Sequence, residues 1–597
     1  MNTVWKYVDF DKEIASNLAD TLEIPLPVAN IMASRNIQTP EDAHEYFDVN
    51  IKKMHNPFLL PDIRTAIERL NQAIDNNEKI FVWGDYDVDG VTATSVVVTS
   101  LNLLGANIEY KVPHRMEDGY DIKMHSVDEA IKRNATLMLS VDCGIVAFET
   151  AEYAKQMGLD LIITDHHHPS EDGKLPNCLA VINPNRDDPD YPGHLFSNES
   201  NKDFKRYPFD ALAGVGIAFK VMLALAHSRK FSIKTMVEEN IEYVALGTVA
   251  DVAPMIDENR ILVHLGCDKL SNSNKPGVKA LLKVAGAKEV NTTTIGFQIG
   301  PRINAIGRLA DSGTALDLLL EKNEVRANFL ATQLDHANKK RQIDQEKATE
   351  DAINFVLKNY DLDDTNILVV WSESWHAGLI GLIAGKIAEK FNKPTLCCTI
   401  KNDGYAKGSC RSVRDFNILD ALKSEEAWAL FKKRADDSTV CGGHAFAAGF
   451  ELHKDNLKPL QKALDKYAKS QSGVSFEDKV VLIDSKMTFS DVSSFTYEEL
   501  TKLSPFGSMN LNPVFSISNL KLVKKSTMSN DKHLKLKFSS KSTTMTIDAN
   551  GWRKGYLFDT FTEGNFYDVA FTLSEDSFYG RKNISLIIED IKPSKTA

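Results

Sequence analysis

Three carboxylates crowd into one short turn and are the first group in this chain that could do chemistry. Asp85, Asp87 and Asp89 lie between Gly84 and Gly90, directly after an apolar run. Like charges this close repel one another, and a divalent cation among them relieves that repulsion. An EF-hand is excluded, because no Glu closes the loop and a strand pattern, not a helix, precedes it. Taken alone, the turn fits either a metal site or a solvated acidic loop.

Carboxylate and imidazole side chains also follow later apolar runs. Asp142 comes directly after one run, Asp-His-His at 165–167 follows another, and Asp251 ends an apolar segment of small residues. The ends of parallel strands meet at one edge of a sheet, where ligands bind, so this recurrence indicates one shared site. Oxygen and imidazole ligands without a thiolate suit manganese or magnesium better than structural zinc.

The elements that must position these side chains can be read from the apolar pattern. From residue 80 to about 225, short apolar runs alternate with helical stretches, which predicts a parallel sheet with crossover helices. The expected strands are 79–83, 108–112, 137–141, 161–164 and 180–182. Before them, the N-terminal segment looks helical, with Thr39 followed by Pro40 as a helix start.

The rest of the chain predicts further domains. No Gly or Pro occurs from 323 to 357, which predicts a long helix connecting two lobes, and strand patterns then resume around a helix at 378–391. After about 475 the alternation is all-β and predicts a small barrel. We therefore predict an α/β protein with five parts: helical 1–75, parallel-sheet 76–320, connecting helix 321–360, second α/β 361–472 and barrel 473–597.

Composition limits the function classes. Of 597 residues, 43% are hydrophobic and 25% are charged, and no apolar run approaches a membrane span. Acidic residues stand where a signal peptide needs an apolar core, so we expect a cytoplasmic protein. Seven cysteines without C-x-x-C spacing indicate reduced thiols, and a net charge of -12 argues against polyanion binding by the whole surface.

One stretch reverses the acidic balance. Between 521 and 554, nine basic residues face two acids, with Phe538, Trp552 and Tyr556 interleaved. The basic residues are Lys521, Lys524, Lys525, Lys532, Lys535, Lys537, Lys541, Arg553 and Lys554. The pattern fits a single-strand path that combines phosphate attraction with base stacking, and the alternative is a solvated basic face.

The motifs at 84–90, 141–144, 164–169 and 247–251 resemble, in this order, motifs I to IV of the DHH phosphoesterase family. The D-Y-D-x-D-G form of the first motif is similar to the RecJ single-strand exonuclease branch. Further RecJ-like segments lie at 113–120, 182–184, 212–216, 300–308, 374–381, 408–412 and 442–449, so the resemblance covers about 20–515. For the C-terminal barrel the resemblance implies an OB-fold. Two departures touch the rim of the site: G-Y-D-I at 119–122 replaces the more usual G-Y-G-L, and the acidic stretch 183–203 is longer than typical.

The resemblance implies roles for particular side chains. Two divalent ions, with Mn²⁺ favoured over Mg²⁺, would be held by Asp87, Asp89, Asp142, His166 and Asp251. Such paired ions activate a water and neutralise charge on a phosphodiester, so no covalent Ser or Cys intermediate is needed.

Asp142 would bridge the ions, while Asp85 fits either ligation or a supporting position, of which we expect the second. His167 would be catalytic together with Asp142, as a donor to the phosphate or as the acid for the leaving oxygen. Cys143 and His168 are assigned no role. We expect Cys143 to be a small packed residue and His168 to be a partly exposed imidazole.

The substrate contacts follow in the same way. The expected DNA-binding residues are Arg115, Arg302, Arg308, Ser409, Arg411, Gly442, Gly443 and His444. Glycines allow close backbone approach to a phosphate and Arg can grip it bidentately, although a lone G-G-H more often marks a turn. Arg115, Ser409 and Arg411 would hold the 5' end and so set the polarity.

The implied activity is a metal-dependent 5' to 3' exonuclease that hydrolyses single-stranded DNA to 5'-mononucleotides in repair and recombination. The alternatives are a DHH phosphodiesterase acting on short oligonucleotides or cyclic dinucleotides, and an inactive DNA-binding replication scaffold. No Walker-type nucleotide motif occurs, so a separate helicase would supply single strands. A single-strand-binding protein is a further expected partner, and the expected state is a monomer with no membrane association.

Overall fold

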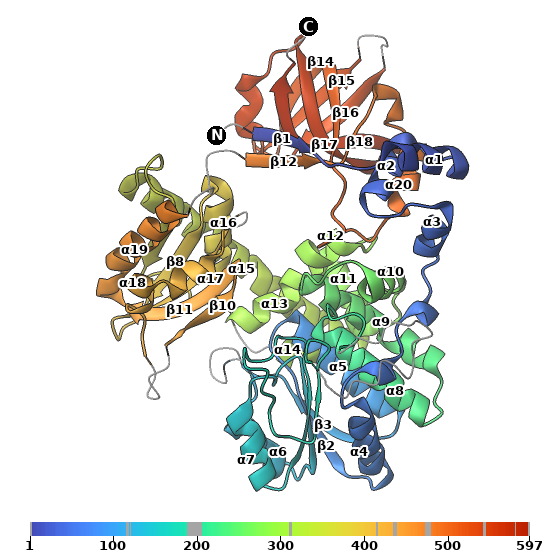
Figure 1. Ribbon diagram of the computed structural model, residues 1–597, viewed down its shortest axis with the longest axis vertical. Helices are drawn as coiled ribbons and strands as arrows, with labels where there is room; N and C mark the ends of the chain where they lie inside the picture. The colour runs from blue at the N-terminus through green and yellow to red at the C-terminus, as the bar shows by residue number, and fades with distance from the viewer. Residues whose placement is uncertain are drawn as a thin grey trace. The chain divides into compact units, whose positions relative to one another are not determined.

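The computed structural model describes residues 3–114, 119, 121–187, 206–309, 313–413, 416–433, 439–471, 479–540, 545–578 and 581–594. The chain divides into two compact units. The smaller unit comprises Met1–Val4 and Asp335–Val480, and the larger unit comprises Trp5–Leu334 and Val481–Ala597. Figure 1 shows the helices and strands of both. None of the described helices combines the length and the apolar character that a membrane span requires.

A five-stranded parallel sheet in the larger unit confirms the predicted strands. Its order is β3-β2-β4-β5-β6. The strands are β2 (Lys79–Trp83), β3 (Asn107–Lys111), β4 (Leu137–Val141), β5 (Asp160–Thr164) and β6 (Ala180–Ile182). The central strand β4 is buried at every residue, as its continuous apolar run requires. The carboxyl ends of β2, β4 and β5 therefore lie next to one another.

Helices surround this sheet and continue beyond it. They are α4 (Ile63–Asp75), α5 (Val88–Leu103), α6 (Met124–Lys132), α7 (Phe148–Gln156), α8 (Gly214–Ser228), α9 (Ile233–Ala250), α10 (Asp257–Ser271), α11 (Pro276–Ala285), α12 (Thr292–Thr294), α13 (Gly300–Leu309) and α14 (Gly313–Leu320), with a π-helix η4 at Ile295–Ile299. Helices α5 and α8 are buried along almost their whole length, which explains their small and β-branched composition. The apolar segment before Asp251 is the end of helix α9.

The N-terminal segment departs from the prediction of a helical region. It contains α1 (Lys12–Leu22), α2 (Leu26–Ser34) and α3 (Pro40–Phe47), and short 3-10 turns η1 (Ile51–Lys53) and η2 (Pro57–Leu59), but it begins with strand β1 (Thr3–Tyr7). β1 pairs with β12 (Lys479–Ile483), and Trp5 donates a hydrogen bond of 2.6 Å to Asp590. The helical prediction is wrong for these residues because the pairing partner lies far away in sequence. The helix start at Thr39 is confirmed, since Thr39 and Asp42 cap each other reciprocally.

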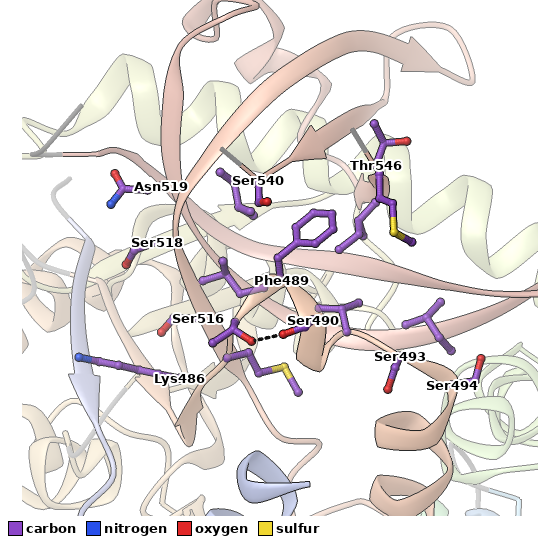
Figure 2. Close-up of a pocket in the computed structure, with 18 of the residues that line it drawn as sticks. Lys486, Phe489, Ser490, Ser493, Ser494, Ser516, Ser518, Asn519, Ser540 and Thr546 are labelled. Carbon is purple, nitrogen blue, oxygen red and sulfur yellow. Dashed lines mark hydrogen bonds between the residues drawn. The ribbon is translucent and has the colours of Figure 1, made fainter. Parts of the chain in front are cut away.

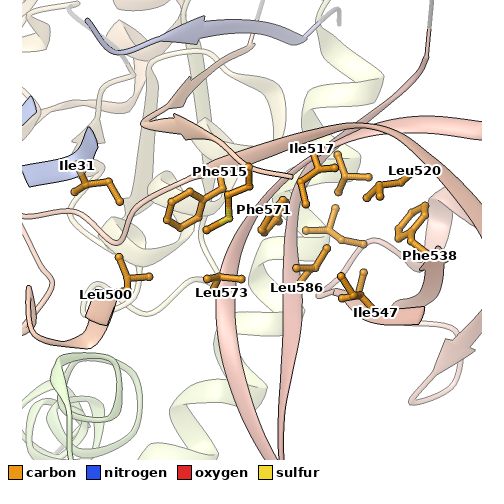
Figure 3. Close-up of a cluster of buried hydrophobic side chains, with 14 of the residues drawn as sticks. Ile31, Leu500, Phe515, Ile517, Leu520, Phe538, Ile547, Phe571, Leu573 and Leu586 are labelled. Carbon is orange, nitrogen blue, oxygen red and sulfur yellow. The ribbon is translucent and has the colours of Figure 1, made fainter. Parts of the chain in front are cut away.

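A closed barrel forms the C-terminal part of the larger unit and confirms the predicted β-barrel. Its strands are β13 (Ser485–Lys486), β14 (Phe515–Met528), β15 (His533–Ser539), β16 (Thr546–Gly551), β17 (Phe566–Phe578) and β18 (Arg581–Pro593), with η6 (Phe489–Asp491), α20 (Ser494–Thr501) and η7 (Gly555–Thr560) between them. The order is β13-β14-β15-β16-β18-β17, and pairing of β14 with β17 closes it. In Figure 3, Ile31 of α2 and Leu500 of α20 lie beside Phe515 and Phe571. The N-terminal helices thus complete the barrel core.

The smaller unit contains a second sheet in the order β10-β11-β9-β8-β7. Its elements are β7 (Leu368–Ser372), α16 (Ile380–Phe391), β8 (Thr395–Ile400), β9 (Tyr405–Arg411), α17 (Ile418–Lys423), α18 (Glu425–Trp428), β10 (Cys441–His444), β11 (Ala447–His453), η5 (Lys454–Asn456) and α19 (Leu457–Ser470). β7 and β8 are parallel and the other pairs are antiparallel. The predicted long helix is confirmed as α15 (Glu324–Asn359).

A buried ion pair links two helices of the larger unit and supports a stability prediction. Lys220 on α8 contacts Glu258 on α10, and both side chains are almost completely buried. Glu258 also accepts hydrogen bonds from the Tyr207 hydroxyl (2.9 Å) and the His55 backbone nitrogen (2.8 Å). Glu258→Ala leaves a buried cation without its counter-charge and should lower the free energy of unfolding by about 3–5 kcal/mol, measured by chemical denaturation. The double variant Lys220→Met/Glu258→Leu should recover most of this loss, and a double variant as unstable as Glu258→Ala would contradict the explanation.

Candidate metal centre

Asp142 lies directly beyond the central strand β4. Its backbone nitrogen donates a hydrogen bond of 2.9 Å to the carbonyl oxygen of Thr164 on β5. Its φ of 64° lies in the left-handed region, which few residues other than glycine adopt without strain. This backbone turn ends the strand at a buried carboxylate that is 2% exposed.

The acidic turn after β2 leads directly into helix α5. Asp87 caps the helix, because its side chain accepts a hydrogen bond of 3.1 Å from the Gly90 backbone nitrogen. Asp89 lies in the first turn of α5, and its carboxylate accepts hydrogen bonds from the backbone nitrogens of Gly214 (2.7 Å) and Val215 (2.8 Å). These nitrogens begin helix α8, so the positive end of a second helix holds the Asp89 carboxylate.

The Asp-His-His motif follows β5, and the first of the three residues positions the last. Asp165 accepts hydrogen bonds from the backbone nitrogens of Ile145 (2.9 Å) and His167 (3.1 Å), and one of its oxygens lies 2.7 Å from Nδ1 of His167. The Asn185 side chain donates to the carbonyl oxygen of His166. Asp165 was not assigned a role from sequence, although its place directly before two histidines in the motif was a usable signal.

The fourth carboxylate comes from a helix end. Asp251 is the C-cap of α9, and Val252 follows it with a φ of 60°. The nitrogen of Ala253 donates to the Thr248 carbonyl oxygen, which completes a tight turn after the helix. A β-branched residue in the left-handed region is a clear outlier.

These segments bring the predicted ligands together. Nε2 of His166 lies 3.2 Å from an oxygen of Asp142 and 3.8 Å from an oxygen of Asp89. Nδ1 of His166 lies 3.9 Å from an oxygen of Asp251. Three overlapping groups have ligand atoms within 4.8 Å of one another: Asp85, Asp87 and Asp142; Asp89, His166 and Asp251; Asp142, His166 and His167. Asp85, which we expected in a supporting position, offers an oxygen in the same group as Asp87.

Burial and mutual repulsion set the charge of these groups. Burial and the charge of Asp251 raise the pKa of Asp89 to about 7, and burial together with Asp87 raises the pKa of Asp251 to about 7. The pKa of Asp142 is raised well above its ordinary value, first by burial and then by the neighbouring carboxylates. Burial lowers the pKa of His166, which favours the neutral imidazole that binds metals.

The residues present fit divalent cations. One oxygen of Asp142 is buried and accepts no hydrogen bond from the described residues, so an acceptor points into the middle of the cluster. Two glycines leave room for this packing: a Cβ on Gly214 would clash with the Asp142 carboxylate, and one on Gly247 would lie 2.9 Å from an Asp89 oxygen. Oxygen and imidazole ligands without thiolates suit Mn²⁺ and Mg²⁺.

His167 differs electrostatically from its neighbour. Burial opposes its charged form, but the hydrogen bond to Asp165 and the charge of Asp165 outweigh burial and raise the pKa of His167 to about 9. Asp121, at one of the two departures from the usual motif, has a φ of 74°, and its pKa is raised to about 6 by burial, with a further contribution from the charge of Asp165. The departure therefore places an additional carboxyl group near the His167–Asp165 pair.

The predicted phosphate contacts divide between the two units. In the smaller unit, a Cβ added to Gly381 in the first turn of α16 would lie 3.0 Å from Oγ of Ser409 and 3.5 Å from an Nη of Arg411. The sheet register places Gly442 in one row with Ser409, separated by Gly449 of β11. The G-G-H residues form the exposed part of strand β10.

The remaining predicted phosphate contacts are Arg115, Arg302 and Arg308. Arg302 lies on α13 of the larger unit and is partly buried, and its guanidinium donates to the Gln298 carbonyl oxygen at 2.6 Å. Arg115 and the Arg308 side chain lie outside the described residues.

The barrel corrects one of the predicted stacking residues. Phe538 is fully buried in the barrel core, because it alternates with the outward-facing Lys537 on β15, so it cannot stack on a base. Trp552 and Tyr556 are exposed. Part of the basic stretch is already engaged: Lys525 donates to the carbonyl oxygens of a neighbouring turn, and Lys537 lies 3.1 Å from Asp548.

A cavity of about 1100 Å³ on the barrel is a separate feature (Figure 2). Ser516 and Ser518 of β14 face it from one side, and Ser490 and Ser493 from the segment before α20. Among its described lining residues, Lys486 is the only ionisable one. Without carboxylates or imidazoles, this cavity does not resemble a metal site.

The raised pKa values lead to a prediction about metal and pH. A carboxyl group whose pKa is raised in the folded state favours folding while it is protonated, and this contribution is lost as the pH rises through the folded-state value, here about 7 for Asp89 and Asp251. Metal requires the ionised form and cancels the repulsion. Adding Mn²⁺ to chelator-treated protein should therefore raise the Tm more at pH 8 than at pH 6, measured by thermal unfolding. An equal or larger increase at pH 6 would contradict this assignment.

Comparisons with known proteins agree with this arrangement. Family models match at residues 79–248 (DHH family, N-terminal domain), 364–470 (DHHA1 domain) and 483–590 (RecJ OB domain). The chain is 32% identical to the single-stranded-DNA-specific exonuclease RecJ of Bacillus subtilis (strain 168), over 99% of this chain and 71% of that protein. It is 31% identical to RecJ of Escherichia coli (strain K12), over 96% of each chain.

A solved structure shows the same architecture. The crystal structure of RecJ in complex with Mn²⁺ from Thermus thermophilus matches 100% of this chain and 80% of that chain, with a TM-score of 0.80 and 25% identity. The resemblance and the fold class predicted from the motifs are thus confirmed. The chain belongs to the RecJ family of single-stranded-DNA-specific exonucleases.

Proposed function

We propose that this protein is a divalent-metal-dependent exonuclease that degrades single-stranded DNA from the 5' end to 5'-mononucleotides. The observation that carries the proposal is the convergence of four acidic or histidine segments on one buried cluster within the larger unit. Family membership supports the same activity. The alternatives, a phosphodiesterase for short oligonucleotides or cyclic dinucleotides and an inactive scaffold, have no specific observation in their favour.

The metal ligands in this proposal are those predicted from the motifs. Asp87, Asp89, Asp142, His166 and Asp251 would hold two ions, Mn²⁺ or Mg²⁺. Bound ions would activate a water and neutralise charge on the phosphodiester. Asp142 and His166 each belong to two of the three overlapping groups, but only a carboxylate has two oxygens that could serve two ions, so Asp142 would be the shared ligand. Membership of Asp85 in the group with Asp87 supports a role as a further ligand.

His167 would contribute a positive charge near the phosphate in addition to the charge of the metal ions. Its pKa of about 9 without bound ions favours the protonated ring at neutral pH, and Asp165 fixes this ring through Nδ1. A fixed imidazolium can stabilise the negative charge that develops on the phosphate or protonate the leaving oxygen. Asp165 is therefore a positioning residue in the proposal.

The 5' end would be held in the smaller unit. Ser409 and Arg411 lie against the first turn of α16, where backbone N–H groups and the helix dipole favour an anion. Gly442 and Gly443 would let a phosphate approach the neighbouring backbone, with His444 as a further contact. As expected from the motifs, Arg115 would also contact the 5' end, while Arg302 and Arg308 would contact neighbouring phosphates. Recognition of a terminal phosphate would set the 5' to 3' polarity.

The barrel would guide the strand beyond the cleavage site. Its exposed Trp552 and Tyr556 stand among Lys532, Arg553 and Lys554, a combination that suits base stacking and phosphate attraction. We further propose the five-part division of the chain given above, a monomer, and a cytoplasmic role in DNA repair and recombination. A helicase and a single-strand-binding protein would be its partners.

The polarity is tested with oligonucleotides labelled at either end. With Mn²⁺, a 5' label should appear at once as a mononucleotide, while a 3' label should remain on progressively shorter strands.

Asp142→Ala should slow hydrolysis by more than about 100-fold, because loss of a ligand exceeds the effect of losing an outer-shell partner. Initial release of the 3' label would refute the polarity, and an unchanged Asp142→Ala rate would refute the site.

The same assay tests the 5'-end contact. Arg411→Gln should reduce the preference for a 5'-phosphate over a 5'-hydroxyl by about 10-fold, because a charge-assisted contact is lost. Lys386→Gln removes a cation from the same helix α16 and serves as the matched control, which should keep the wild-type preference.

A further inference from the structure

A single buried amide joins the two backbone segments that support Asp251 and Asp89. Asn259 lies in the first turn of α10 and is fully buried. Its Nδ2 atom donates hydrogen bonds to the carbonyl oxygens of Ala211 (2.7 Å) and Pro254 (3.0 Å). Both hydrogens of one amide group are therefore used, one for each segment.

Pro254 belongs to the turn that follows Asp251. In this turn Val252 adopts a φ of 60°. A β-branched residue in the left-handed region is unfavourable by itself, so contacts from outside the turn must hold it. The hydrogen bond from Asn259 to Pro254 is such a contact, and it fixes the backbone that follows the Asp251 carboxylate.

Ala211 belongs to the segment that leads into α8. The first nitrogens of this helix, those of Gly214 and Val215, donate to the Asp89 carboxylate at 2.7 and 2.8 Å. The residues between Ala211 and Gly214 are buried, so this segment cannot shift without moving the start of α8. Asn259 therefore acts on Asp89 through the first nitrogens of α8.

The partners of the amide determine its orientation. Two carbonyl oxygens require a group with two N–H bonds, and a flipped amide would place its own oxygen against both of them. Oδ1 of Asn259 is buried and accepts no hydrogen bond from the described residues. An apolar side chain of similar size would remove the hydrogen bonds to both carbonyl oxygens and with them the link between the two segments.

The sequence neighbours of Asn259 hold α10 in place on either side of it. Glu258 forms the buried ion pair with Lys220 of α8. Cζ of Arg260 lies 3.7 Å from the ring centroid of Tyr46, and the guanidinium donates to the Tyr46 carbonyl oxygen at 2.8 Å. Because both neighbours are anchored, the amide between them is a rigid link.

We propose that Asn259 is a positioning residue for one of the two metal ions, the ion held by Asp89, His166 and Asp251 together with the shared Asp142. Asp89, His166 and Asp251 form one of the overlapping groups of possible ligands, and Asn259 fixes the supports of two of them. The inference rests on the proposed function, because it concerns the metal centre assigned there.

The expected effect is on the affinity for metal. Loss of a hydrogen-bonding partner behind the ligands typically weakens metal binding by about 10- to 100-fold. The group of Asp85, Asp87 and Asp142 shares no member with the group that Asn259 supports. The ion at Asp85 and Asp87 should therefore keep its affinity, and only one of the two Mn²⁺ affinities should fall.

Calorimetric titration of Mn²⁺ into the chelator-treated full-length protein measures both affinities. Asn259→Leu should weaken one of them about 10-fold or more and leave the other within about 3-fold of wild type. Asn240→Leu is the matched control, because Asn240 is an equally buried amide on α9 that donates to the Ser100 hydroxyl and the Met236 carbonyl oxygen. This control should destabilise the fold and leave both Mn²⁺ affinities unchanged. Asn259→Ser, a smaller change, gives the same comparison where Asn259→Leu does not fold.

Nuclease rates give a second readout. For Asn259→Leu, the Mn²⁺ concentration that gives half of the maximal rate on a single-stranded oligonucleotide should rise about 10-fold or more. The kcat at saturating Mn²⁺ should stay within about 3-fold of wild type, because every ligand is still present. A loss of stability alone would not separate these two quantities, and a kcat that stays low at saturating Mn²⁺ would contradict the proposal.

Further outcomes separate the inference from the proposed function. Unchanged Mn²⁺ affinities in Asn259→Leu, or an equal loss of affinity in Asn240→Leu, would overturn the role of Asn259. Equal weakening of both ions in Asn259→Leu would overturn the assignment to one ion. A wild type that binds no Mn²⁺, or that binds it and degrades no oligonucleotide, would instead overturn the proposed function, so the two failures are distinguishable.

Discussion

Repulsion among buried carboxylates is the constraint on which the rest of this structure depends. Asp89 and Asp142 are almost fully buried, with Asp251 and the acidic turn beside them, and their raised pKa values show that the cluster without cations favours protons. The fold holds the groups in place through backbone contacts: the first nitrogens of α8 fix Asp89, and the left-handed turn after β4 fixes Asp142. Such a site is prepared for a divalent cation before one binds.

Much of this cluster was predictable because each proposed ligand stands at or just beyond the end of an apolar segment. A short buried strand followed by Asp or His places the side chain at the carboxyl edge of a parallel sheet, so β2, β4 and β5 could be found from local pattern alone. The segment before Asp251 predicted the place of this carboxylate in the cluster but not the element that carries it, because small apolar residues fit a buried helix as well as a strand.

Features that depend on distant parts of the chain were not predictable. The pairing of β1 with β12 and the packing of Ile31 against the barrel require partners more than 450 residues away. Whether the Phe538 side chain points into the core or to solvent depends on the strand register, which the order of basic and aromatic residues does not determine. The π-helix at Ile295–Ile299 and the left-handed φ of Val252 are conformations against local preference, so no sequence pattern predicts them.

The most direct test of the central claim is anomalous diffraction from crystals of the wild-type protein soaked in Mn²⁺. The account predicts two manganese peaks inside the carboxylate–histidine cluster, both within reach of the Asp142 carboxylate, and loss of at least one of them in Asp142→Asn. Manganese peaks absent from the cluster, or two peaks that persist unchanged in Asp142→Asn, would contradict it.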